Sequence, residues 1–359
     1  DSFRYTGQAI EILKFGFFKN LALKTELDVL PLYPYLISFF YKLFGVNNYF
    51  PIILFQSFIV GLISLILGLI AEIFNKKWFY PTIFLCCIWP NLIWRVSYIS
   101  PEVIFTFFII LSFYLALKFF LLKKSYLIYL SFFVLGLAFI TRPNAILIPF
   151  FLLILISIFL KVRENYSSTK IIKVVLFCLI SFFSIISFQF YKVYVVSGEF
   201  GYTSQSGRVL MNYTYPCLAQ KYACGKRNVD ALEKIQEKVY AIERDLPAKY
   251  FDNSIIISNI QKEVAIESIL KLPIEQLLLS SISSITKFFY HNFYYDVLER
   301  FKIKDIHISE TNNIKDFFFK IMQSTHMQAW LFFQVVLIFI GRIVQIFGFL
   351  NLMKDKKYS

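Results

Sequence analysis

The chain alternates long apolar runs with short polar segments. A helix needs about 20 residues to cross the hydrocarbon core of a bilayer, and runs near this length recur along the chain. They predict seven membrane spans: Ile52–Phe74, Phe79–Tyr98, Val103–Leu122, Tyr126–Ile140, Ala145–Leu160, Ile171–Val196 and Ala329–Leu352. The fourth run is short, and Pro90 with Asn91 interrupts the second. We therefore expect an all-α polytopic membrane protein.

Basic residues indicate which connections face the cytoplasm. Short cytoplasmic loops carry an excess of Lys and Arg, and three connections and the C-terminal tail of this chain do so. The basic residues are Lys76, Lys77, Lys123, Lys124, Lys161, Arg163, Lys170, Lys173, Lys354, Lys356 and Lys357. The alternate connections then face outward: residues 1–50, Ser97–Glu102, Thr141–Asn144 and the long segment after Val196.

This orientation divides the chain into four parts. Residues 1–50 form the first outer loop, and residues 51–196 form a six-span bundle. Residues 197–328 form an extracytoplasmic segment, and residues 329–359 hold the last span and a cytoplasmic tail.

The first outer loop contains two amphipathic segments. Tyr5, Ala9 and Ile12 share one helical face, so a short helix is predicted over residues 2–14. The stretch "VLPLYPYLISFFYKLFG" (Val29–Gly45) is bounded by prolines and too short to span a bilayer. We expect both helices to lie on the membrane surface.

The extracytoplasmic segment is predicted to be mainly helical. Apolar residues recur at three- and four-residue spacing from Val229 to Ile242, which indicates an amphipathic helix, and a second helix is expected after Asn253. Leu272–Tyr295 is ambiguous, because as a span it would reverse the last helix. We interpret it as an interfacial or protein-buried helix.

Composition agrees with a membrane protein. Apolar residues make up 58% of the chain and charged residues 17%, against about a quarter charged in soluble domains. The formal net charge of +14 raises the question of a nucleic-acid partner. We exclude that class because the basic residues gather at the ends of apolar runs and no basic stripe accompanies a stacking platform.

Several short motifs follow one another on the outward loops. An Asp opens the chain with Tyr four residues and Ala eight residues later, and "PLYPYLISFFYKLFG" and Gln56 come next. "YISPEVIF" (Tyr98–Phe105) and "TRPNAILIPF" (Thr141–Phe150) then occupy the second and third outward loops. This ordered series resembles the GT-C glycosyltransferases, and specifically the bacterial protein-mannosyltransferase and aminoarabinose-transferase type. It covers roughly the first 200 residues.

The resemblance implies an activity and a location. Members of this family move a sugar from a polyprenyl-phosphate carrier to an acceptor hydroxyl at the outer face of the cell membrane. We therefore expect inverting transfer to an extracytoplasmic lipid glycan, polysaccharide or protein, with the active site on the periplasmic side of the plasma membrane. Because the loop Asp of the family follows the first transmembrane helix, an eighth span is expected upstream of Asp1.

The resemblance also implies site residues. Asp1 takes the role of general base or ligand of a divalent metal such as Mg²⁺ or Mn²⁺, Glu102 assists it, and Tyr5 and Tyr33 bind substrate. The alternative is that both acidic residues have a structural role. Asp1 caps the first helix, and Glu102 is a favourable charge at a helix start.

Three basic residues are candidates for binding the donor phosphate. Arg142 lies at an outer helix end, and Arg95 and Lys192 lie near the outer ends of the second and sixth runs. The alternative is that long basic side chains reach from the helix to the lipid headgroups. We favour function for Arg142 and this structural interpretation for Arg95 and Lys192.

The cysteines fall into two groups. Cys86, Cys87 and Cys178 lie within apolar runs and are interpreted as small buried residues. Cys217 and Cys224 lie in the outward segment, where an oxidising compartment favours a disulfide between them.

Some features depart from the family pattern. Ser2 follows Asp1 where many relatives have a second acidic residue, and Leu30 stands where the aminoarabinose transferases have a basic one. No "WWD" occurs, which argues against the oligosaccharyltransferase branch.

Two other classes of function stay open. A transporter or flippase for a lipid-linked glycan would share the apolar bundle, but transporters usually show paired halves or helices broken at the midplane. The chain has only 12 Gly and no visible repeat, which disfavours this class. A non-catalytic scaffold predicts that Asp1, Glu102 and Arg142 do not cluster.

Overall fold

The structure is a computed structural model that describes residues 2–16, 27, 29–89, 92, 95–219, 229–247 and 253–281. Every regular element within these ranges is a helix, which confirms the all-α prediction. The chain divides into two compact units. One comprises Asp1–Gln205 and Pro247–Asn259, and the other comprises Ser206–Leu246 and Ile260–Ser359.

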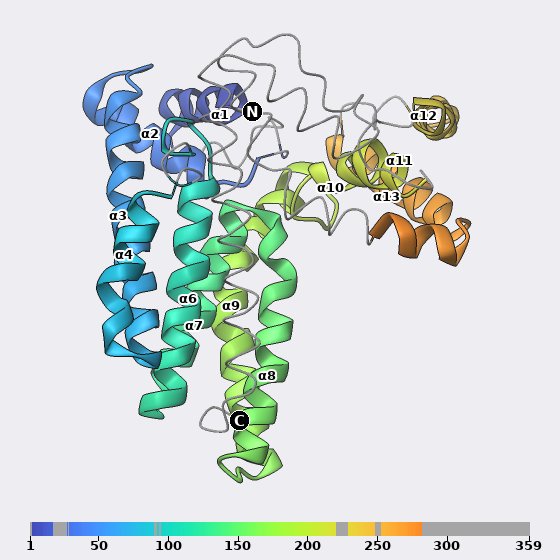
Figure 1. Cartoon of the computed structure of the whole chain (residues 1–359). Coiled ribbons are helices and arrows are strands. Elements are labelled where there is room, and N and C mark those ends of the chain that lie inside the picture. Colours follow the sequence, from blue (N-terminus) through green and yellow to red (C-terminus); the bar gives the residue numbers. More distant parts are fainter. Residues whose placement is uncertain are drawn as a thin grey trace, which may run out of the picture. The chain divides into compact units, whose positions relative to one another are not determined.

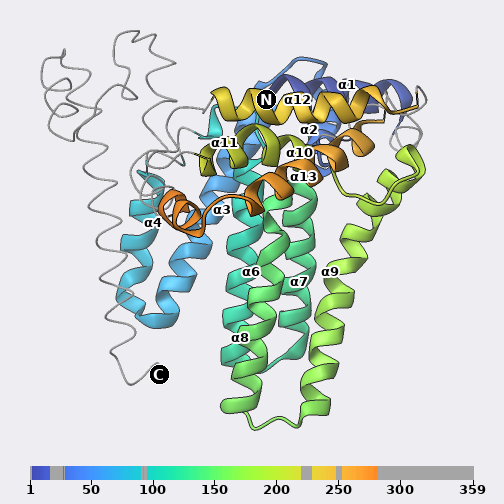
Figure 2. The ribbon, with the colours of Figure 1, turned by 90° about the vertical axis from the view of Figure 1, so that its right-hand side faces the viewer.

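The first unit holds the described helices that are long and apolar enough to be membrane spans. Four helices in the described ranges are long and apolar enough to cross a bilayer, and they confirm four of the predicted spans. They are α3 (Phe50–Phe74), α6 (Glu102–Leu122), the 3-10 turn η3 (Pro143–Leu147) continued by α8 (Ile148–Val162), and α9 (Ser168–Ser197). The predicted fourth span is the shorter α7 (Ser125–Thr141). Figures 1 and 2 show α6, α7, α8 and α9 running along one another.

The predicted span Phe79–Tyr98, which Pro90 and Asn91 interrupt in the sequence, is not one unbroken helix in its described residues. Helix α4 (Phe79–Cys87) lies against α3, but Ile88 is a turn and Trp89 has no regular structure. Pro90 supplies the reason, because proline disfavours the helical conformation of the residue before it and lacks an N–H donor. The helical run is therefore broken near its middle.

The predicted span Ala329–Leu352 lies outside the described residues, as does Asp1. Of the ambiguous segment Leu272–Tyr295, residues 274–281 are helical and the later part is also outside the description.

One end of the bundle carries two further helices, α1 (Ser2–Phe15) and α2 (Leu32–Phe44). They confirm the two helices predicted for the first outer loop. Pro31 precedes α2, and Gly45 ends it with a φ of 94° that glycine adopts without strain. Both helices lie at the end of the bundle where α6 begins (Figures 1 and 2).

The opposite end carries the basic connections. Lys76 and Lys77 lie between α3 and α4, Lys123 and Lys124 lie between α6 and α7, and Arg163 caps α8. A salt bridge joins Lys123 to Glu164, which links two of these turns.

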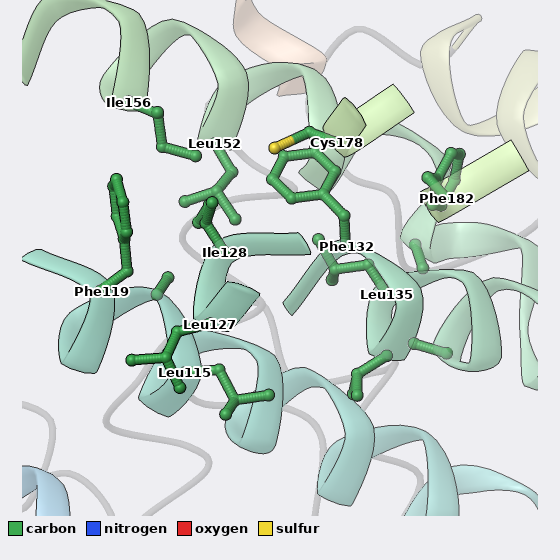
Figure 3. Close-up of a cluster of buried hydrophobic side chains, with 14 of the residues drawn as sticks. Leu115, Phe119, Leu127, Ile128, Phe132, Leu135, Leu152, Ile156, Cys178 and Phe182 are labelled. Atoms are coloured by element: carbon green, nitrogen blue, oxygen red, sulfur yellow. The ribbon is translucent and has the colours of Figure 1, made fainter. Parts of the chain in front are cut away.

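Close packing of α7 against α6 and α9 forms the main core of this unit (Figure 3). Phe132, Leu135 and Phe182 are almost fully buried in it. Between α6 and α7 the hydroxyl of Ser131 donates to the Ser112 carbonyl at 2.9 Å, and the two hydroxyls are 2.8 Å apart. Gly136 lets α7 approach α9 closely, because a Cβ there would lie 2.9 Å from Ile185 Cβ. Small residues and serine bonds of this kind drive helix association in membranes.

The second unit has its own small core. Helix α12 (Val229–Arg244) is amphipathic, as predicted, and buries Ile235 and Val239. The predicted helix after Asn253 is α13 (Ser254–Leu270), whose Val264 and Ala265 belong to the same cluster. Cys217 in α11 (Tyr215–Leu218) is disulfide-bonded, and its predicted partner Cys224 lies outside the described residues.

We predict that Gly136→Ala lowers the stability of the protein by about 1–3 kcal/mol, since the new methyl group overpacks the contact with Ile185 and the Phe182 carbonyl. Thermal unfolding in detergent measures this. The matched control is Gly61→Ala in α3, where no described atom lies within 4 Å of an added Cβ. The control should unfold at the same or a slightly higher temperature. Equal effects of the two substitutions would contradict the packing account.

Candidate active site where α6 begins and α7 ends

Two helix ends bring opposite charges together. Glu102 is the first residue of α6, where a carboxylate is favoured by the helix dipole. Arg142 caps the C-terminus of α7, where a cation is favoured. Its backbone is extended because Pro143 follows it, so α7 stops at Thr141 and the Arg142 side chain leaves the helix at its end.

The two side chains form an ion pair. Arg142 Nη1 is 3.1 Å from Glu102 Oε1, and the side chains are 36% and 25% exposed. Glu102 Oε2 is buried and has no hydrogen-bond partner within the described residues. The Ser100 hydroxyl, two residues earlier, is likewise buried without a partner there. The pair therefore leaves unused acceptor capacity beside a partly exposed guanidinium.

Two tyrosines from the first outer loop adjoin the pair. The rings of Tyr5 in α1 and Tyr33 in α2 meet edge to face, with centroids 5.3 Å apart. Burial is the main cause that raises the pKa of Tyr5, and the charges of Arg142, Glu102 and Arg4 act on it as well. Burial also raises the pKa of Tyr33 well above its usual value, with Glu102 acting in the same direction. Both phenols therefore keep their protons at neutral pH and are hydrogen-bond donors.

The buried side-chain amide of Gln56 connects Tyr33 to the loop before Glu102 through hydrogen bonds. The Tyr33 hydroxyl donates to Gln56 Oε1 at 2.6 Å. Gln56 Nε2 in turn donates to the carbonyls of Val96 at 2.9 Å and Tyr98 at 2.8 Å. These bonds fix α2, α3 and the loop "YISPE" relative to one another, and Gln56 is fully buried between them.

The structure thus brings together Tyr5, Tyr33, Glu102 and Arg142 of the residues predicted for the site. Lys192 is 2% exposed on the buried stripe of α9, and Arg95 is half-buried ahead of the loop. Asp1 lies outside the described residues, so its role stays a prediction.

The metal site predicted at Asp1 and Glu102 stays a prediction. Within the described residues, no group of three or more His, Cys, Asp and Glu side chains is arranged to hold a metal ion. Glu102 is the one carboxylate of the predicted pair that the structure describes, and Arg142 occupies one of its oxygens.

The sequence analysis missed two features of the site. Gln56 belonged to the family resemblance but had no assigned role, although a polar amide within an apolar span is itself a signal. Ser100 gave no signal, because serine is common at the starts of helices.

We predict that Tyr33→Phe lowers the free energy of unfolding by about 1–3 kcal/mol, because it leaves the buried Gln56 Oε1 without its donor. The control is Tyr126→Phe, which removes a hydroxyl from an exposed ring in α7. Thermal unfolding in detergent compares the two variants. A Tyr33→Phe protein as stable as the control variant would show that the Gln56 bridge contributes little.

Residues 28–188 match the family model described as dolichyl-phosphate-mannose-protein mannosyltransferase. Comparisons with curated proteins and with solved structures gave no match. The matched range includes Tyr33, Gln56, Glu102 and Arg142, and it confirms the resemblance to GT-C glycosyltransferases. The match over residues 28–188 supports a GT-C-like mannosyltransferase family, whose members generally use polyprenyl-phosphate sugars as donors.

Proposed function

We propose that this protein transfers a sugar from a polyprenyl-phosphate donor to an acceptor hydroxyl at the extracytoplasmic face of the membrane, with inversion at the anomeric carbon. One observation carries the proposal. The Glu102–Arg142 pair, partly exposed and bordered by Tyr5 and Tyr33, lies at the bundle end that bears the two helices of the first loop.

The distribution of basic residues supports the outward orientation of this site. The opposite end of the bundle carries the lysines and arginines of three connections. Since short cytoplasmic loops collect such residues, that end is assigned to the cytoplasm. The α1–α2 end then faces outward, where a lipid-linked donor presents its sugar.

Arg142 is suited to the phosphate of the donor. A guanidinium has five N–H donors, and the contact with Glu102 involves one nitrogen, Nη1. The remaining donors match the oxygens of a phosphate, where negative charge develops as the sugar leaves. Glu102 holds the guanidinium in place before the donor binds, which reduces the ordering required during the reaction.

Glu102 is suited to the acceptor. Its Oε2 is a buried acceptor without a partner in the described part of the chain, so a hydroxyl that donates to it would satisfy both groups. The phenols of Tyr5 and Tyr33 border the carboxylate and stay protonated. They are therefore donors for sugar oxygens near the reacting centre.

The reaction then forms one bond and breaks one. The acceptor oxygen attacks the anomeric carbon on the side opposite the phosphate, and the bond between that carbon and the phosphate oxygen breaks. The acceptor proton passes to a carboxylate, which by family resemblance is Asp1 with Glu102 assisting. The polyprenyl phosphate leaves with its charge held by Arg142. A divalent ion on Asp1 and Glu102, if the full site holds one, would lower the pKa of the acceptor hydroxyl.

The packing favours the enzyme over a transporter. Transporters bind their cargo near the midplane between broken helices. Here α3, α6 and α9 are continuous. The run that starts with α4 is broken, but the ion pair lies at the ends of two other helices, α6 and α7. The buried polar groups deep in α6 and α7 are the hydroxyls of Ser112 and Ser131, which satisfy each other.

We predict that Arg142→Gln lowers the rate of sugar transfer by about 10²–10³-fold, the usual effect of removing one charge-stabilising donor. The assay follows loss of label from a polyprenyl-phosphate sugar in membranes that contain the protein. Arg163→Gln is the matched control, because Arg163 also caps a helix C-terminus but lies at the opposite end of the bundle. Equal rates for wild type and Arg142→Gln would remove Arg142 from the site. No transfer from any labelled donor would favour the transporter class.

A further inference from the structure

The second unit contains a cavity that the proposed reaction does not use. Its volume is about 420 Å³, within the range of about 300–1,000 Å³ that is usual for sites of small molecules. Helices α11, α12 and α13 contribute to its wall. The residues that line it include Tyr215, Lys234, Ile235, Glu237, Lys238 and Ser268. All of them belong to the second unit, so one compact body forms the cavity.

The apolar part of the cavity wall belongs to a packed core. Ile235 is 1% exposed and packs with Met211 and with apolar residues of α13. Tyr215 is partly buried against the same cluster. It directly follows a π-helical turn, Leu210–Thr214, and turns of this kind occur frequently at functional sites. The packing therefore holds the tyrosine in place before any ligand binds.

Ser268 is a second and independent indication of a ligand. The residue lines the cavity and is only 8% exposed, yet its hydroxyl has no hydrogen-bond partner among the described residues. A buried polar group without a partner costs stability. Alanine at this helical position would avoid that cost and has a better helix propensity. A ligand in the cavity would supply the missing partner.

The charged residues of the cavity leave an excess of positive charge. Lys234 and Lys238 lie one turn apart on α12, and Glu237 lies between them. None of the three forms a salt bridge with a described residue. Lys238 helps to lower the pKa of Glu267, but the main cause is Lys271, which is the ion-pair partner of Glu267. Two ammonium groups against one carboxylate favour an anionic ligand.

We propose that this cavity binds a saccharide unit that carries a carboxylate, of the uronic-acid class. The C–H groups on the apolar face of a sugar ring pack on an aromatic face, which Tyr215 can supply. Ser268 and Glu237 are suited to the sugar hydroxyls, since serine donates and accepts and a carboxylate accepts. Lys234 and Lys238 are suited to the sugar carboxylate through charge-assisted hydrogen bonds. The identity of this saccharide as part of the acceptor glycan rests on the proposed function, whereas its binding does not.

The experiment titrates the full-length protein in detergent with tetragalacturonate and with its neutral methyl ester, and isothermal calorimetry measures the affinities. Wild type should bind the acid at least about tenfold more tightly than the ester, because hydrogen bonds to charged groups are the stronger ones. The double variant Lys234→Gln/Lys238→Gln should weaken binding of the acid by a similar factor. Both lysines are exposed on a helix, so the variant should fold normally.

Ser268→Ala tests the neutral part of the site. It should weaken binding of tetragalacturonate by about two- to tenfold, the usual effect of one neutral hydrogen bond. Its thermal unfolding should occur at the same or a higher temperature than that of wild type, because no hydrogen bond to a described residue is lost. Lys262→Gln is the matched control, since it removes an exposed lysine of α13 outside the cavity and should leave the affinity unchanged.

Three outcomes would overturn the proposal. The first is a wild type that does not bind tetragalacturonate, or whose affinity neither variant changes. The second is equal affinity for the acid and the ester. The third is inorganic phosphate that binds as tightly as tetragalacturonate, which would identify a site for simple anions. Because the titration needs no sugar donor, these failures leave the transfer reaction untouched. A protein that binds the saccharide but transfers no sugar would keep the cavity and contradict the proposed function.

Discussion

The contact between Glu102 and Arg142 joins two membrane helices at the place where each one begins or ends. Its 3.1 Å separation follows from the packing of α6 against α7 and from the proline after Arg142, which directs the arginine off the helix end. The tyrosines of the first loop adjoin this pair, and their protonation depends in part on its charges. Tyr5 of α1, Tyr33 of α2 and the loop that Gln56 binds all lie beside this contact. The proposed chemistry uses the same contact.

The packing of the helices next to the site determines how precisely the side chains of Glu102 and Arg142 are held. In a membrane there is little hydrophobic driving force between helices, so association depends on close contact and hydrogen bonds. Gly136 brings α7 near α9, and the Ser112–Ser131 bond joins α6 to α7 (Figure 3 shows the surrounding apolar contacts). Rigid packing of these three helices holds Glu102 and Arg142 within bonding distance. The Gln56 bonds transmit the same rigidity to α2 and the loop before Glu102.

Much of the fold followed from the sequence, because the length of an apolar run and the place of basic residues are direct consequences of the bilayer. Four spans and both surface helices were predicted within a few residues of their bounds. The break after Cys87 was indicated by Pro90, which interrupts the second apolar run and cannot continue a regular helix, although its exact position was not predicted. Glu102 and Arg142 were candidates individually, but their pairing depends on tertiary contacts between α6 and α7 that no local pattern encodes.

The central claim is that Glu102 and Arg142 act as one unit in sugar transfer. A double-mutant cycle with labelled polyprenyl-phosphate sugar tests it most directly, with rates compared for wild type, Glu102→Gln, Arg142→Gln and the double variant. Residues in one ion pair should show strong coupling, so the double variant should be little slower than the slower single variant. Single-variant losses that simply multiply in the double variant, or single variants as fast as wild type, would contradict the account.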